Sequence, residues 1–73
     1  MGEMKVRIIA KSNAVTRARI VKGMTQRELA DLTGISYAYI SLLERSMKTI
    51  GPGTAKKLAE VLERPFEELF ELR

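Results

Sequence analysis

Apolar residues recur every three or four positions along most of this chain, the spacing that places them on one face of an α-helix. This spacing predicts five short helices, over residues 14–22, 26–33, 37–45, 52–62 and 65–70. Residues 5–9 differ, because β-branched side chains in partial alternation predict a short strand there. A lone strand is not stable, so this one must pair, either with the tail near Leu72 or with a second copy of itself.

Residues that favour helix ends stand at the predicted boundaries. Thr25 followed by Glu28 is a capping box, in which each side chain accepts a hydrogen bond from the other residue's backbone N–H. Pro52 suits the first position of a helix, where a missing N–H costs nothing. The other end signals are Ser12, Asn13 and Ser36 as N-caps and Gly23 and Gly34 as C-terminal stops.

Each predicted helix has one apolar stripe, so a single core can serve all five helices. The prediction is an all-α fold of five helices with a short N-terminal β-strand. A chain of 73 residues has material for one small core. We therefore expect one helical domain over residues 12–73, preceded by an N-terminal arm over residues 1–11.

The sequence lacks cysteine and histidine, which excludes disulfides, Cys or His nucleophiles, and zinc sites built on these residues. The carboxylate pairs Glu67/Glu68 and Glu28/Asp31 are expected on exposed helix faces without a base partner. We therefore expect no enzyme, no catalytic residue, no metal and no cofactor. Apolar runs are too short to span a membrane, and Arg7 interrupts the best candidate for a secretory signal. A soluble, cytoplasmic protein is expected.

The net charge of +4 is unevenly distributed. Residues 1–49 hold nine Lys/Arg and four Asp/Glu, a net +5, whereas residues 50–73 hold four and five, a net −1. A basic front and a mildly acidic tail favour one face for a polyanion and another for a different partner. A solvated surface with chance asymmetry explains the charge distribution equally well.

Residues 26–45 hold the most informative pattern. Two helices joined by a three-residue turn cross steeply, which demands a small residue at the close approach, a turn residue that tolerates positive φ, and apolar inner faces. Ala30 and Gly34 meet the first two demands. The apolar inner faces are supplied by Leu29, Ile35, Ile40 and Leu43. Because all these demands are met in register, residues 26–45 are predicted to be a helix-turn-helix unit.

The outward face of the third predicted helix carries no charge. Its residues are Tyr37, Ala38, Ser41 and Leu42, and the cations that flank it are Arg27, Arg45 and Lys48. A purely structural surface helix normally shows charged side chains on such a face. A neutral face rimmed by cations suits insertion between two phosphate walls, where Tyr and Ser can hydrogen-bond and Ala and Leu can touch thymine methyl groups. The alternative is a helical hairpin without a ligand.

With these residues the chain resembles the phage-repressor (Cro/Xre-like) helix-turn-helix family, over about residues 12–70. The residues that carry the resemblance are Arg19, Gly23, Met24, Thr25, Gln26, Glu28, Leu29, Ala30, Gly34, Ile35, Ser36, Tyr39, Ile40, Ser41, Leu43, Glu44, Arg45, Pro52, Ala59, Leu62, Glu68, Leu69 and Phe70. The resemblance implies a five-helix, lambda-repressor-like domain whose second and third helices read double-stranded DNA.

The resemblance also implies roles for single residues. The base-reading positions would be Ser36, Tyr37, Ala38, Ser41 and Leu42. The phosphate-binding positions would be Gln26, Tyr39, Arg45, Lys48 and Thr49, to which the flanking cation Arg27 is added. Gln26 would also brace the recognition helix, and packing of the ring is the alternative for Tyr39. Arg19 and Glu44 would form a structural salt bridge between the first helix and the end of the third.

Five positions depart from the family pattern. Ser46 and Glu63 stand where glycine is common, and Arg64 stands where a small apolar residue is usual. Ile20 and Val21 are apolar where the family tends to be polar. We interpret these two as a slightly wider core stripe, with a contact surface as the alternative.

A domain of this size inserts one short helix, so we expect a homodimer that represses sterically from a pseudo-palindromic operator. Candidate dimer surfaces are the strand, through Val6 and Ile8, and the tail, through Phe66 and Leu72. Activation through RNA polymerase is an alternative, for which the acidic residues Glu60, Glu63, Glu67, Glu68 and Glu71 are available. A protein-interaction role as an antitoxin or adaptor, or contact with an antagonist protein, also stays open.

Overall fold

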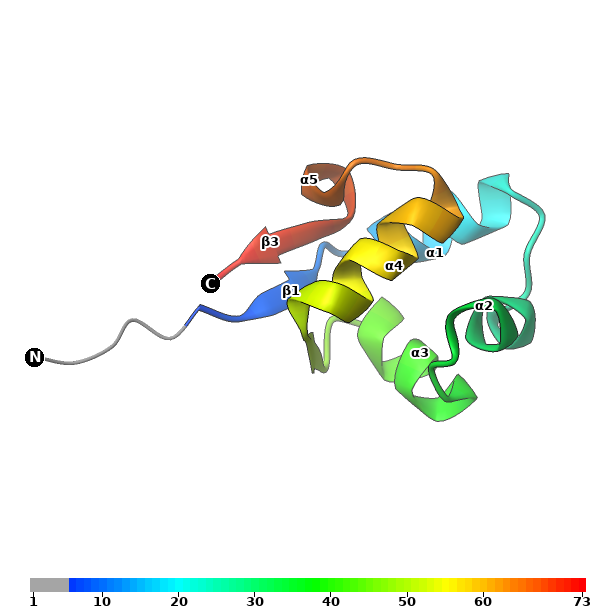
Figure 1. Cartoon of the computed structure of the whole chain (residues 1–73), viewed down its shortest axis with the longest axis horizontal. Coiled ribbons are helices and arrows are strands. Elements are labelled where there is room, and N and C mark those ends of the chain that lie inside the picture. The colour runs from blue at the N-terminus through cyan, green and yellow to red at the C-terminus, as the bar shows by residue number, and fades with distance from the viewer. Residues whose placement is uncertain (1–5) are drawn as a thin grey trace, which may run out of the picture.

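The computed structural model describes residues 6–73, which contain five helices and three short strands (Figure 1). In chain order they are β1 (Ile8–Ala10), α1 (Ala14–Val21), α2 (Gln26–Thr33), α3 (Tyr37–Glu44), β2 (Thr49–Ile50), α4 (Pro52–Leu62), α5 (Phe66–Leu69) and β3 (Phe70–Leu72). The predicted five-helix fold is confirmed. Residues 1–5, which include the first residue of the predicted strand and part of the predicted arm, lie outside the described residues.

Local side-chain bonds explain where α2 and α3 begin. The Thr25 hydroxyl accepts from the Glu28 N–H at 3.0 Å, and the Glu28 carboxylate accepts from the Thr25 N–H at 2.8 Å, so the predicted capping box is present. Ser36 caps α3 by accepting from the Tyr39 N–H at 3.2 Å. The prediction for Asn13 was wrong in mechanism: it is the N-cap of α1 at φ 64°, but its side chain makes no capping bond.

The three strands form one antiparallel sheet in the order β2-β1-β3. Ile8 of β1 pairs with Ile50 on one side and with Leu72 on the other. The N-terminal strand therefore pairs with the tail of the same chain, which was one of the two possibilities left open by the sequence. The strand is Ile8–Ala10 rather than residues 5–9, and Phe70, predicted to end the last helix, begins β3.

One core gathers residues from every helix and from all three strands. Its buried apolar residues are Ile8, Ala10, Val15, Ala18, Leu29, Ala30, Ile40, Leu43, Ile50, Ala55, Leu58, Leu62, Leu69 and Phe70. Ile8 is therefore a core residue, only 9% exposed, and the expectation that it contacts a second chain was wrong. Ile20 and Val21 are 60% and 70% exposed, so the interpretation of a wider core stripe was also wrong.

Helix α2 lies at the opposite end of the molecule from β1 and β3 (Figure 1). Figure 1 shows β1 and β3 side by side at the left, with α2 at the right and α3 along the lower edge. The turn from α4 into α5 lies along the upper edge. The outward face of α3 is thus well separated from α5. Within residues 6–73, no helix has the length and hydrophobicity needed to cross a membrane.

Candidate nucleic-acid interface

Helix α3, the predicted DNA-reading helix, divides its residues between the core and the surface. Ile40 and Leu43 are fully buried, which fixes the rotation of the helix against α2. Of the predicted base-reading residues, Ser36, Tyr37 and Ala38 are exposed, and Ser41 and Leu42 are half-buried. The amino-terminal half of α3 therefore presents an uncharged surface of small and hydroxyl-bearing side chains.

Exposed cations lie on both sides of this uncharged surface. Arg27 extends from α2, and its guanidinium carbon lies 5.2 Å from the centre of the Tyr37 ring, within the range of a cation–π contact. Arg45 and Lys48 are exposed after the end of α3, and Thr49 is exposed in β2. The structure thus places the predicted phosphate-binding residues around the predicted base-reading residues.

A polar cluster centred on Glu44 joins α1, α2 and α3. The Glu44 carboxylate accepts from Arg19 Nε at 2.7 Å, from Gln26 Nε2 at 2.9 Å and from the Thr16 hydroxyl at 2.9 Å. Arg19 also donates to the Met24 carbonyl at 2.8 Å. The Glu44 side chain is 4% exposed and the Arg19 side chain 11%. This cluster fixes the end of α3 to both preceding helices.

The contacts of Glu44 outweigh the effect of its burial. Burial by itself raises the pKa of this carboxyl, because the charged form loses its hydration. Hydrogen bonds from Arg19, Gln26 and Thr16, with the Arg19 charge, favour the ionised form and hold the pKa below its usual value. Glu44 is therefore a carboxylate at neutral pH, and it can hold Arg19 and Gln26 in fixed positions.

Gln26 stands at the first position of α2, next to an open hollow of about 570 Å³. The hollow is lined by Arg19, Met24, Thr25, Gln26, Arg27 and Tyr37. One N–H of the Gln26 amide donates to Glu44, and the amide nitrogen carries a second N–H. The unpaired backbone N–H groups at a helix start favour anions, so the hollow is suited to a phosphate group.

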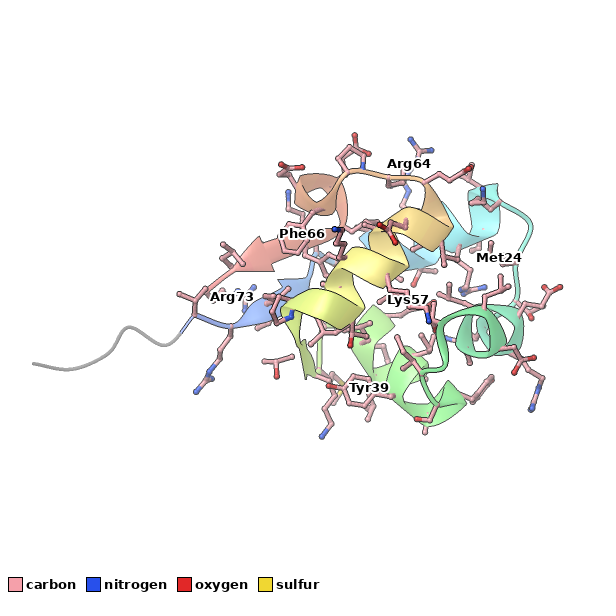
Figure 2. The ribbon with its side chains drawn as sticks, viewed as in Figure 1. Met24, Tyr39, Lys57, Arg64, Phe66 and Arg73 are labelled. Atoms are coloured by element: carbon pink, nitrogen blue, oxygen red, sulfur yellow. The ribbon has the colours of Figure 1, made fainter. Side chains whose placement is uncertain are left out.

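The loop after α3 is tied back to the helix and to the sheet. The Tyr39 hydroxyl donates to the Thr49 carbonyl, and Figure 2 shows Tyr39 at the lower edge of the molecule, on α3. The Tyr39 ring is half-buried and packs against the core, the alternative that the sequence left open for it. Ser46 donates to the Ala10 carbonyl at 2.7 Å. The sequence did not predict this role of Ser46, although serine at this position already differed from the glycine that is common in the family.

Thr16 is a second residue that sequence reasoning missed. It precedes Arg19 by three positions on α1, so both side chains lie on the same face of the helix. That spacing was the available signal, because Arg19 was already predicted to reach Glu44. Among the described residues, no group of three or more His, Cys, Asp or Glu side chains could hold a metal ion.

The remaining predicted dimer residues differ in exposure. Val6 is 55% and Leu72 61% exposed, whereas Phe66 is half-buried against the core with its ring 5.3 Å from that of Phe70. Figure 2 shows Phe66 beside α4. An open groove of about 720 Å³ runs between α4 and α5 and is lined by Pro52, Lys56, Ala59, Glu60, Glu63, Arg64, Pro65 and Phe66.

Comparison with known proteins identifies what this arrangement resembles. The model of the helix-turn-helix family matches residues 16–69. The fold is similar to that of the restriction-modification controller protein C.AhdI from Aeromonas hydrophila, with a TM-score of 0.70 and 28% identity over 77% of this chain and 85% of that one. It is also similar to the transcriptional regulator VanUg, with a TM-score of 0.67 and 18% identity over 100% of this chain and 93% of that one. No curated protein matches the sequence.

Proposed function

The chain belongs to the helix-turn-helix family of DNA-binding transcriptional regulators, and on that premise we propose that it is a repressor that reads a pseudo-palindromic operator as a homodimer. In this proposal α3 enters the major groove and the protein blocks a promoter by occupying it, in the cytoplasm of a prokaryote. The observation that carries the proposal is the uncharged outward face of α3 between Arg27 on one side and Arg45 and Lys48 on the other.

Base reading falls to the outward face of α3 and to Ser36 at its start. Tyr37 and Ser41 can donate to or accept from base edges, and Ala38 is small enough to touch a thymine methyl group. Leu42 adds a second apolar contact, and Ser36 reaches the groove from the start of the helix. The contact between Arg27 and Tyr37 limits the freedom of the Tyr37 ring, which favours discrimination between bases.

Phosphate binding falls to the residues on either side of α3. Gln26 would donate its free amide N–H to one phosphate while Glu44 holds the other N–H. Arg45, Lys48 and Thr49 would bind phosphates on the opposite wall of the groove, with Tyr39 beside them. These contacts supply affinity and register, and the base contacts supply sequence preference.

Dimerisation would double the area that one small domain offers to DNA. The candidates for it among the described residues are Val6, Leu72 and the α4–α5 groove with Phe66. Figure 2 shows Phe66 away from α3. The C.AhdI structure is that of a controller protein, so control of a restriction-modification operon is one setting in which such a repressor would act.

A protein-interaction role, as an antitoxin or adaptor, is the second candidate function. The exposed pair Ile20 and Val21 favours it, because these apolar side chains lie on α1, outside the DNA-reading surface. Under this alternative the protein partner covers α1, and duplex DNA binds weakly or without dependence on salt.

Selection of bound duplexes from a random library tests the proposal directly. We expect an enriched site with two-fold symmetry and an affinity that falls steeply with salt. Lys48→Ala should weaken binding to all sequences and make the slope of log K against log salt about 1 less negative. Tyr37→Ala should instead relax the preference at one or two base pairs.

Lys57→Ala is the matched control, because Lys57 is also an exposed cation, lies on α4 and is not among the residues that line the α4–α5 groove (Figure 2). It should leave both the affinity and the salt slope unchanged. Absence of any salt-dependent binding by the wild-type protein would refute DNA recognition. An enriched site without two-fold symmetry would refute the homodimer alone.

A further inference from the structure

Ser46 has a backbone conformation that serine rarely adopts. It directly follows Arg45, the C-cap of α3, and has φ 59°, in the left-handed region that favours glycine. Its hydroxyl donates to the carbonyl of Ala10 in β1, 36 residues away in sequence, at 2.7 Å. A residue that is strained locally but bonded over such a distance points to a tertiary role.

The geometry of the sheet explains why Ala10 needs this bond. Arg7 exchanges backbone hydrogen bonds with Arg73, and the Lys11 N–H donates to the Leu69 carbonyl, so the odd-numbered residues of this segment face β3. Because backbone groups alternate along a strand, Ile8 and Ala10 face β2. β2 has only two residues, and these pair with Ile8 and Ile9. The Ser46 hydroxyl therefore takes the place of the missing β2 residue opposite Ala10.

Three connections hold the segment between α3 and α4. Ser46 bonds Ala10, Tyr39 bonds the Thr49 carbonyl, and Thr49 pairs with Ile9. The exposed cations Arg45 and Lys48 lie within or beside this short segment. Their side chains are flexible, but the backbone that carries them is attached to the sheet.

We propose that Ser46 is a positioning residue for DNA binding: its bond to Ala10 fixes the loop that presents Arg45 and Lys48 to the phosphate backbone. This inference rests on the proposed function, because it assumes that these cations bind phosphate. It gives the N-terminal strand a part in DNA affinity, although the strand does not belong to the helix-turn-helix unit. The loop is pre-arranged, so less conformational freedom is lost when DNA binds.

Two substitutions separate the hydroxyl from the backbone conformation. Ser46→Gly removes the bond and makes φ 59° easy to adopt, so the fold is retained while the loop gains freedom. Ser46→Ala also removes the bond but keeps the unfavourable conformation. If only the backbone conformation at residue 46 mattered, the Ser46→Gly variant would bind DNA as well as the wild-type protein does.

The matched control is Asn13→Gly. Asn13 also has a left-handed conformation at a helix end, φ 64°, but it precedes α1, and its side chain makes no capping bond. A change of stability without a change of DNA binding is expected for this control.

The experiment uses the full chain and two probes, a random-sequence duplex and poly(dA–dT), with affinity measured at several salt concentrations. For Ser46→Gly and Ser46→Ala we expect a slope of log K against log salt that is about 1 less negative, as for the loss of one phosphate contact. Unfolding curves for each variant fix the folded fraction, and circular dichroism confirms the helix content.

A combined variant shows through which residue Ser46 acts. In the Lys48→Ala background, Ser46→Gly should change the slope less than it does in the wild type, because contacts that share a partner are not additive. Folded Ser46 variants with the wild-type slope and affinity would overturn the inference while leaving DNA recognition intact. Wild-type protein without salt-dependent binding would overturn both.

Discussion

Among the residues of the Glu44 cluster, Arg19 is the one whose substitution should destabilise the domain most. In Arg19→Met the Glu44 carboxylate keeps its bonds from Thr16 and Gln26 but loses its counter-charge. A carboxylate that is 4% exposed cannot regain its hydration without opening the contact between α1 and α3. The free energy of unfolding is expected to fall by about 3–5 kcal/mol, the usual cost of breaking a buried ion pair from one side.

That loss is large for a chain of 73 residues. Domains of this length have a free energy of unfolding on the order of 4–11 kcal/mol. Each 1 kcal/mol lowers the melting temperature of a domain this size by about 4–8 °C. Arg19→Met should therefore melt at least about 12 °C below the wild type, and Glu44→Leu should also be destabilised because it leaves the Arg19 charge buried.

The double variant Arg19→Met/Glu44→Leu distinguishes the cost of an unpaired charge from the value of the pair. With both charges gone, the site becomes apolar, and the stability should recover to well above that of Arg19→Met. Urea unfolding followed by circular dichroism gives the three free energies and the coupling between the two positions. A double variant whose loss equals the sum of the two single losses would refute the reasoning.

Three further predictions concern acid stability and helix ends. The pKa of Glu44 is lower in the folded than in the unfolded chain, so its stabilisation is complete above about pH 4.5 and is lost as pH falls through the folded value. Urea titrations between pH 2 and 7 should show a flatter acid limb for Glu44→Gln, whereas Glu63→Gln should change the limb less, because the lowered pKa of Glu63 comes from an exposed contact with Lys22 that solvent screens. Thr25→Ala removes the hydroxyl of the capping box and should cost about 1 kcal/mol in thermal unfolding, and an unchanged melting temperature would contradict the role of the cap. Gly34→Ala should cost about 1–2 kcal/mol from its φ of 74° alone, since a Cβ there meets no heavy atom within 4 Å, and a larger loss in urea unfolding would indicate a steric clash instead.

The helices and their order could be predicted because each depends on signals within a few residues. The capping box at Thr25 and Glu28 and the Ser36 cap are local bonds, and the sequence shows both partners together. The apolar spacing of α2 and α3 likewise depends on one short window, and it correctly placed Leu29 and Ile40 in the core.

The strands could be predicted only in part, because a strand two or three residues long is defined by its partner. Thr49 and Ile50 have no local pattern that favours β2, and they become a strand through their register with Ile8 and Ile9. Phe70 continued the apolar spacing of the last helix, but its pairing with Ala10 places it in β3. Ile8 was assigned to an interface for the same reason, since the chain segments that bury it are distant in sequence.

The candidate site depends on long-range contacts that only the fold reveals. Arg27, Arg45 and Lys48 were recognisable as cations around a neutral helix, but the contact of Arg27 with Tyr37 requires the observed crossing of α2 and α3. Ser46 looked like an unfavourable substitution for glycine until its bond to Ala10 was visible. Residues that break a local rule in this way have an explanation at the level of tertiary structure.

The proposed recognition helix has two different kinds of attachment at its carboxyl-terminal end, and this arrangement matters for how it would read DNA. The end of α3 is fixed to α1 and α2 through the charged cluster at Glu44, which also orients Gln26. The loop that follows is fixed to the sheet through Ser46 and Tyr39. The residues proposed to bind phosphate on either side of α3 are thus attached to the same folded core as the helix itself. Because base contacts discriminate only when the helix keeps one orientation, we expect that loosening the Glu44 attachment reduces sequence preference more than it reduces total affinity. Loosening the Ser46 attachment should instead weaken binding to all sequences, because it acts on the proposed phosphate contacts.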